Sequence, residues 1–174
     1  MLSPNTESRL VTLRPAGVED AAQVYEILFR LGSAGLPLID QFVESFGEGK
    51  AACFLVHRKD TGQLIGVSSL SDLAPAGHVR AEIELVAEST DELRAEVNAL
   101  TVNFAFAMWR TRKVYFHLTT PDAGELGLGA DLPREEVVLS DYTYFHGRLW
   151  DVHVVAIYRE DWDEAGLDII KQIV

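Results

Sequence analysis

Two glutamates with strand spacing are the first residues in this chain that suggest chemistry. Glu82 and Glu84 lie in "HVRAEIELVAE", where they alternate with Ala81, Ile83 and Leu85. A period of two predicts a strand with both carboxylates on one face and the apolar side chains on the other. A carboxylate in such a position could accept a proton as a general base. The alternative is an acidic face that is solvated or that lines a substrate site.

The strand runs through a short turn into a helix, in "IELVAESTDELRAEV". A helix N-terminus offers free backbone N–H groups and a positive dipole end, so such a junction can hold a phosphate. This junction has no glycine, and its first basic residue is Arg94. Ser89 and Glu92 fit a capping box, in which Ser89 is the N-cap and Glu92 reaches back to it. The residues thus predict a capped helix with an acidic first turn, formed by Asp91 and Glu92.

The sequence shows no residue pattern typical of other kinds of catalytic site. The histidines do not recur at metal-ligand spacing, so we expect no metal. Neither a "GxSxG" motif nor a Ser, His and Asp set suggests a hydrolase. The single cysteine, Cys53, lies in the apolar run "AACFLV" and is expected to be a small core residue.

The composition narrows the possible partners. The chain has 174 residues, 48% hydrophobic, with a net charge of −12. That length fits one domain with a sizeable core, and the acidic balance argues against nucleic-acid binding and against an anionic membrane surface. Without a secretory signal pattern or a long apolar run, we expect a cytoplasmic protein.

The elements that position these residues follow from periodicity. Residues 1–8 predict a flexible tail, and 9–174 a single domain. The expected order is strand, two helices, a hairpin around "DTGQ", the strand with the two glutamates, a long helix over 90–109, a strand in "KVYFHLTT", an irregular Gly-rich loop and a last hairpin around His146-Gly147. This order predicts an α/β domain with a mixed, mostly antiparallel sheet and helices on both faces.

The same order, with its local motifs, resembles the GNAT family of N-acetyltransferases, in particular the branch that acetylates the N-termini of ribosomal proteins. The motifs are "LVTLRPAGVEDAAQVYEI", "FLVHRKDTGQLIGVSSL", "AEIELV", "FAFAMWRTRKVYFHL" and "YFHGRLWDVHVVAIYREDW". Together they cover roughly residues 9–163. A GNAT-like fold and transfer of an acetyl group, or a related acyl group, from a CoA thioester to a primary amine are what the resemblance implies.

The resemblance also implies roles for individual residues. Glu82 matches a general-base position, with Glu84 beside it, and we add Tyr142 as a third candidate catalytic residue. Acetyl-CoA is expected along the strand end and the turn, at Leu85, Val86, Ala87, Ser89 and Thr90. The last hairpin borders the family's acceptor groove, where an aromatic and partly acidic surface suits a cationic amine or a peptide N-terminus. There we expect Tyr144, His146 and Trp150 to bind the acceptor, with ordinary strand packing as the alternative for the tyrosines.

Two departures from the family pattern leave the function open. The family's turn carries Arg or Gln followed by glycines, whereas this chain has "STDELRA", which weakens the expected pyrophosphate site. "TTPDAGELGLGADL" replaces the family's short fourth helix, and we treat it as a flexible loop. The alternatives are therefore a GNAT-fold enzyme that uses an acyl carrier protein or other chemistry, and a non-catalytic binding protein.

Overall fold

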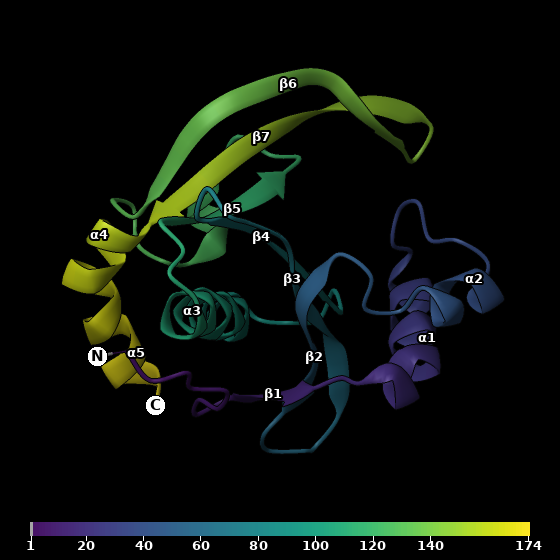
Figure 1. Ribbon diagram of the computed structural model, residues 1–174, viewed down its shortest axis with the longest axis horizontal. Helices are drawn as coiled ribbons and strands as arrows, with labels where there is room; N and C mark the ends of the chain where they lie inside the picture. The colour runs from purple at the N-terminus through teal and green to yellow at the C-terminus, as the bar shows by residue number, and fades with distance from the viewer. Residues whose placement is uncertain (1) are drawn as a thin grey trace.

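The computed structural model describes residues 2–174, which form one α/β domain (Figure 1). The predicted order of elements is confirmed. The strands are β1 Val11–Pro15, β2 Lys50–Arg58, β3 Leu64–Ala74, β4 His78–Leu85, β5 Lys113–Leu118, β6 Pro133–Phe145 and β7 Arg148–Tyr158. The helical segments are η1 Val18–Asp20, α1 Ala21–Leu31, α2 Ile39–Glu44, α3 Asp91–Met108, η2 Ala123–Leu126, α4 Arg159–Asp161, η3 Trp162–Gly166 and α5 Leu167–Ile173.

The seven strands of the described chain join one sheet in the order β1-β2-β3-β4-β5-β7-β6. Every neighbouring pair is antiparallel except β4 and β5, which run parallel where His78–Arg80 pair with Lys113–Tyr115. The mixed, mostly antiparallel sheet is therefore confirmed. The parallel pair is created by the crossover through α3, as parallel strands require.

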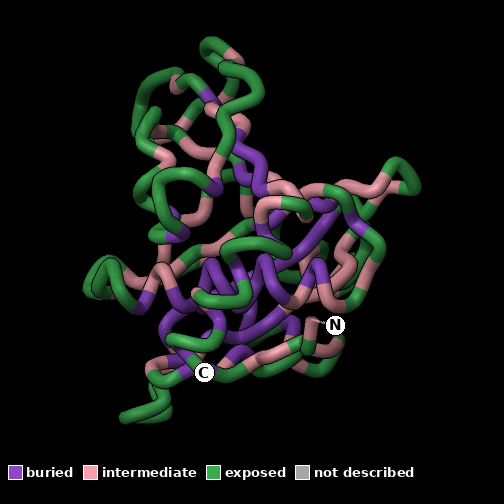
Figure 2. Tube along the Cα trace, turned by 90° about the vertical axis from the view of Figure 1, so that its left-hand side faces the viewer, coloured by how far each residue is buried: buried purple, intermediate pink, exposed green. Residues whose placement is uncertain are grey.

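Helices cover both faces of the sheet, as predicted (Figure 1). On one face Val24 and Ile27 of α1 pack against Leu55 of β2 and Val67 of β3. The opposite face carries α3 and α5, which pack on the alternate side chains of the same strands. Figure 2 shows the buried part of the trace gathered in the middle of the domain.

The central helix α3 buries polar side chains as well as apolar ones, and these find partners. The hydroxyl of Thr101 lies 2.8 Å from that of Ser68 on β3 and also donates to the carbonyl of Val97. The amide of Asn103 donates to the carbonyl of Ser3 at 2.7 Å. Such hydrogen bonds offset the desolvation of the buried groups and fix how the helix sits on the sheet.

Both ends of the chain are bound to this helix. Within the expected flexible tail over residues 1–8, the carbonyl of Ser3 accepts from Asn103, and the carbonyl of Thr6 accepts from Leu13 N–H; the flexibility of this tail stays a prediction. Met1 lies outside the described residues. At the other end of α3, the Arg159 guanidinium donates to the carbonyls of Phe106, Trp109 and Thr111, which satisfies carbonyl groups at and just beyond the helix C-terminus.

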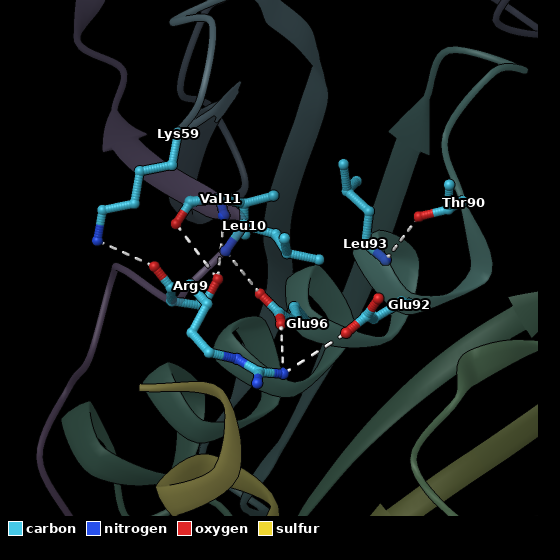
Figure 3. Close-up of polar contacts among 9 residues, drawn as sticks. Arg9, Leu10, Val11, Lys59, Thr90, Glu92, Leu93 and Glu96 are labelled. Carbon is cyan, nitrogen blue, oxygen red and sulfur yellow. Dashed lines mark hydrogen bonds and ion pairs between the residues drawn. The ribbon is translucent and has the colours of Figure 1, made fainter.

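A buried glutamate joins the residues just before β1 to α3 (Figure 3). Glu96 has a side chain only 1% exposed, accepts a hydrogen bond from Leu10 N–H at 3.0 Å and lies 3.5 Å from the Arg9 guanidinium. Glu92, one turn earlier, lies at the same distance from Arg9 but is 67% exposed. The two carboxylates thus share a helix face and a cation and differ mainly in burial.

This difference predicts the stability of two matched variants. Glu96→Ala removes a buried acceptor and leaves the partly buried Leu10 N–H without its partner, so it should lower the free energy of unfolding by about 1–3 kcal/mol. Glu92→Ala removes only an exposed ion pair and should change it by no more than about 0.5 kcal/mol. Urea denaturation of both variants measures the difference, and equal losses would contradict this account of Glu96.

Candidate active site

The feature that shapes the site is the separation of β4 from β5. The two strands pair only up to Arg80 and Tyr115, after which β4 continues beside β3 to Leu85 and β5 continues beside β7 to Leu118. A cavity of about 370 Å³ lies between the separated strands. It is lined by Ala81, Glu82, Ile83, Glu84 and Leu85 of β4, Phe116, His117 and Leu118 of β5, Arg94 and Asn98 of α3, and Glu125 and Leu126 of η2.

The loop after β5 bounds this cavity because it packs tightly on α3. Asn98 donates a hydrogen bond to the carbonyl of Leu126 at 2.8 Å. Gly127 follows with a φ of 66°, and a Cβ there would lie 2.5 Å from the Cβ of Ala95. Only a glycine combines that backbone conformation with such a close approach. The segment expected to be a flexible loop therefore contains one short helical turn, η2, held against α3.

Polar side chains gather on the sheet face that also carries α1. Strand register places Arg80, Glu82 and Glu84 on this face of β4, and Tyr115 and His117 on the same face of β5. The predicted common face of Glu82 and Glu84 is confirmed. Their apolar neighbours, including Ala81 and Phe116, point to the face that carries α3. The cavity is therefore lined from both faces of the sheet.

Charge on the polar face is organised around Arg80. Its guanidinium lies 2.9 Å from Glu82 and 3.5 Å from Asp72. Asp72 lies where β3 bulges away from β4, and its φ of 55° is unusual for a residue other than glycine. Glu84 accepts a hydrogen bond from the hydroxyl of Ser33, in the loop between α1 and α2. Glu82 and Glu84 thus each have a fixed partner.

His117 is a cavity residue that the sequence analysis did not select. Loss of hydration around the ring, and then the Arg80 guanidinium, lower the pKa of His117, while Glu82 and Asp72 act weakly in the opposite direction. The Tyr115 ring lies 5.6 Å away, and burial raises the pKa of that phenol. A signal existed in "KVYFHL", because its alternation separates Tyr115 and His117 from Val114 and Phe116.

The turn before α3 differs in detail from the prediction. The N-cap is Thr90, whose hydroxyl accepts from Leu93 N–H at 3.3 Å, so the capping box of Ser89 and Glu92 is wrong. Ser89 belongs to the turn instead, because its own N–H donates to the carbonyl of Val86. Val86 N–H donates to the carbonyl of Ile65. The backbone N–H groups of Val86 and Ser89 are therefore both hydrogen-bonded within the chain and are not available to a phosphate.

The remaining predicted cofactor residues lie at the rim of the cavity and beyond it. Leu85 lines the cavity, while Ala87 and Thr90 are exposed on the turn. The acidic first turn of α3 is confirmed, but Arg9 lies 3.5 Å from Glu92 and offsets part of its charge (Figure 3). Whether acetyl-CoA binds to this turn stays a prediction.

Arg94 faces the cavity from the second turn of α3. Within residues 2–174 no carboxylate lies within ion-pair distance of its guanidinium. An unpaired guanidinium beside a cavity is suited to an anionic group, because it can form two parallel charge-assisted hydrogen bonds. In the sequence Arg94 stands out only as the first basic residue of the junction, and nothing there gave it a role.

The predicted acceptor residues do not line this cavity. Tyr144, His146 and Trp150 lie near the tip of the β6–β7 hairpin, where His146 and Gly147 form the turn with positive φ. Trp150 stacks on Phe145 there. The hairpin arches over the sheet and ends on the side of α2 (Figure 1). Tyr142 lies closer, in the bulge of β6, with its ring 6.5 Å from that of His117.

Three further observations concern other kinds of site. Within residues 2–174, no three His, Cys, Asp or Glu side chains are grouped so as to hold a metal ion. Cys53 is partly buried, and burial raises the pKa of its thiol, which disfavours the nucleophilic thiolate. None of the described helices combines the length and the apolar character that crossing a bilayer requires.

Comparisons with known proteins agree with this architecture. No family model matches the chain, and no curated protein matches its sequence. Among solved structures, mutant forms of the spermidine/spermine N-acetyltransferase SpeG from Vibrio cholerae have a TM-score of 0.70 at 19% identity over 88% of this chain and 96% of that one. The spermidine N-acetyltransferase from the same organism, in complex with CoA and spermine, has a TM-score of 0.72 at 17% identity over 87% of this chain and 97% of that one. The chain therefore has the GNAT fold that its motif order predicted.

The surroundings of His117 predict how its imidazole titrates. Since Arg80 lowers the pKa of His117, the variant Arg80→Gln should raise that pKa. The control is Arg58→Gln, which removes the arginine at the end of β2 that pairs with Asp60 and should leave the pKa of His117 unchanged. Imidazole chemical shifts followed by NMR against pH measure both. In the wild type the unfolded chain binds more protons than the folded chain between the lowered and the ordinary pKa, so this residue makes stability rise with pH there. A pKa of His117 above its ordinary range would contradict the assignment.

Proposed function

We propose that this protein is an N-acyltransferase that moves an acetyl or related acyl group from a CoA thioester to a primary amine of a small molecule. The observation that carries the proposal is the cavity between β4 and β5, which brings two unpaired strand edges, a guanidinium and three carboxylates together. The GNAT fold of the chain supports the same reaction class. The fold alone would not decide the function, because one fold can serve several chemistries.

The residues present fit the acyl donor, with one change from the family's pattern. The backbone edges of β4 and β5 that face the gap have no strand partner beyond Arg80 and Tyr115 in the described chain, so they can hydrogen-bond the amide-containing arm of CoA. Arg94 and the remaining free N–H groups at the start of α3 would then bind the phosphates of CoA. CoA supplies the activated acyl carbon as a thioester. In this arrangement a side chain replaces much of what glycine-rich backbone does in the family.

The acceptor side favours a cationic amine. Glu82, Glu84 and Asp72 place three carboxylates on one face with Arg80 as the cation among them, so the group has a net negative charge. A carboxylate near the surface attracts an ammonium group about 4 Å away by about 1 kcal/mol or more. The similar Vibrio cholerae structures carry the names of spermidine and spermine, and polyamines are the acceptor class that we propose here.

Roles follow for the residues that were predicted to be catalytic. Glu82 and Glu84 hold the acceptor ammonium beside the cavity. Tyr142, whose ring lies 6.5 Å from that of the cavity residue His117, is proposed as the proton donor to the departing sulfur. A peptide N-terminus, as in the ribosomal-protein branch, is the second acceptor class. Tyr144, His146 and Trp150 at the hairpin tip would serve a longer acceptor of that kind better than a small one.

The donor side of the proposal is tested with binding measurements. Acetyl-CoA should bind to the wild type, and Arg94→Ala should weaken it roughly tenfold to a hundredfold, since a hydrogen bond to a charged group contributes about 1.5–3 kcal/mol. Pantetheine has no phosphate and should bind equally to both proteins. Arg110→Ala, just beyond the other end of α3, is the matched control. Isothermal titration calorimetry measures each combination of protein and ligand.

The same titration decides between the donor hypotheses. Asp91→Asn combined with Glu92→Gln removes the acidic first turn and should strengthen acetyl-CoA binding without affecting pantetheine. No binding of acetyl-CoA to the wild type at millimolar concentration would overturn the proposed function. Acylation from an acyl carrier protein in that situation would support the alternative donor, and a co-purifying protein without turnover would support a binding role.

The acceptor side predicts a change in KM. Glu82→Gln with Glu84→Gln removes two negative charges beside the acceptor and should raise the KM for spermidine by roughly an order of magnitude. The increase for a monoamine should be smaller, because it carries less positive charge. Glu164→Gln, an exposed carboxylate near the C-terminus, should change neither value. Initial rates with both amines and with a basic peptide measure this, and a preference for the peptide would identify the second acceptor class.

A further inference from the structure

We propose that His117 is the general base of this site and accepts the proton that the acceptor amine must lose. The inference rests on the proposed function, because it assigns a residue to that reaction. The geometry that carries it is the position of His117 in the cavity lining, on the same sheet face as Glu82 and Glu84. An amine held by these carboxylates therefore lies beside the imidazole.

The imidazole is free to accept a proton. Within residues 2–174 neither ring nitrogen of His117 has a hydrogen-bond partner, although two aromatic neighbours fix the ring. Tyr115 lies 5.6 Å away on the same strand, and Tyr142 approaches edge-on at 6.5 Å from the bulge of β6. By contrast, His153 on the neighbouring strand β7 lies 2.7 Å from Glu135 and is already engaged.

On balance, the surroundings of His117 lower its pKa and so favour its neutral form. Loss of hydration around the ring lowers the pKa of His117 most, and Arg80, which faces the ring from β4, lowers it further. Glu82 on β4 and Asp72 on β3 oppose this shift but contribute less. Tyr115 stays protonated because burial raises the pKa of its phenol, and Val154 of β7, the strand partner of His117, carries no charge. A neutral imidazole is the form that a general base requires.

Glu82 is the less suitable base of the two. Its carboxylate lies 2.9 Å from the Arg80 guanidinium, so protonation of Glu82 would break an existing ion pair. Protonation of His117 breaks no contact. Glu82 is therefore better suited to holding the ammonium, and His117 to removing its proton.

The step balances in atoms and electrons. The amine nitrogen gives one proton to a ring nitrogen of His117 and uses its lone pair to form a bond to the acyl carbon. The carbon–sulfur bond breaks, and its electron pair leaves with the sulfur. The new bond leaves a positive charge and a second proton on the nitrogen. This second proton passes to the departing sulfur through Tyr142, and His117 returns the first proton to solvent, so that one ammonium and one thioester give amide, thiol and one free proton.

His117→Gln tests the assignment, because glutamine keeps a polar side chain of similar length and does not titrate near neutral pH. We expect kcat for spermidine acetylation to fall about a hundredfold or more. The acid limb of the pH–rate profile should disappear, while the KM for spermidine and the affinity for CoA should stay within about twofold of the wild-type values. His57→Gln on β2 is the matched control and should keep both the rate and the pH profile. Added imidazole should restore part of the activity of His117→Ala.

A second measurement does not depend on turnover. In the wild type bound to CoA, which carries no acyl group, added spermidine should shift the NMR signals of the His117 ring, and those of His57 should not move. An unchanged rate and pH profile in His117→Gln, with an active wild type, would overturn the role of His117 and leave the proposed function standing. A wild type that neither binds acetyl-CoA nor acetylates any amine would overturn both.

Discussion

The divergence of β4 from β5 is the constraint on which the rest of the site depends. Parallel strands that stayed paired would leave no room for a ligand and no free backbone groups at the centre of the sheet. Here β3 holds β4 and β7 holds β5, so each strand keeps one neighbour after the other is lost. The loop after β5 supports this opening, because Gly127 lets η2 lie directly against α3.

The helix α3 then decides which groups the cavity contains. Its N-cap, Thr90, lies outside the cavity lining, and its first turn carries Asp91 and Glu92. Arg9 balances Glu92, while Arg94 enters the cavity with no carboxylate against it in the described chain. Positive charge is thus supplied by a side chain one turn further along the helix rather than by glycine-rich backbone at its start.

Hydrophobic periodicity was enough to predict the order of the elements, the sheet and the shared face of Glu82 and Glu84, because these depend on patterns within each segment. The predicted N-cap was wrong by one residue, since Ser89 and Thr90 are both competent caps and the turn from Val86 decides between them. Tyr144, His146 and Trp150 could not be placed from sequence, because their distance from the cavity depends on how far the β6–β7 hairpin extends. Arg94 and His117 could not be assigned a role from the sequence, because the cavity that they line forms only where β4, β5 and α3 meet.

The electrostatics of the polar face favour proton transfer from the ammonium to an imidazole rather than to a carboxylate. When an ammonium gives its proton to His117, the positive charge moves a short way and stays beside Glu82, Glu84 and Asp72, so the attraction between them is largely kept. Transfer to Glu82 would instead neutralise a carboxylate and leave Arg80 with Asp72 alone at 3.5 Å. In the proposed reaction Arg80 would therefore serve two groups. Its guanidinium lies 2.9 Å from Glu82, the carboxylate proposed to bind the amine, and it adds to the effect of burial in lowering the pKa of His117.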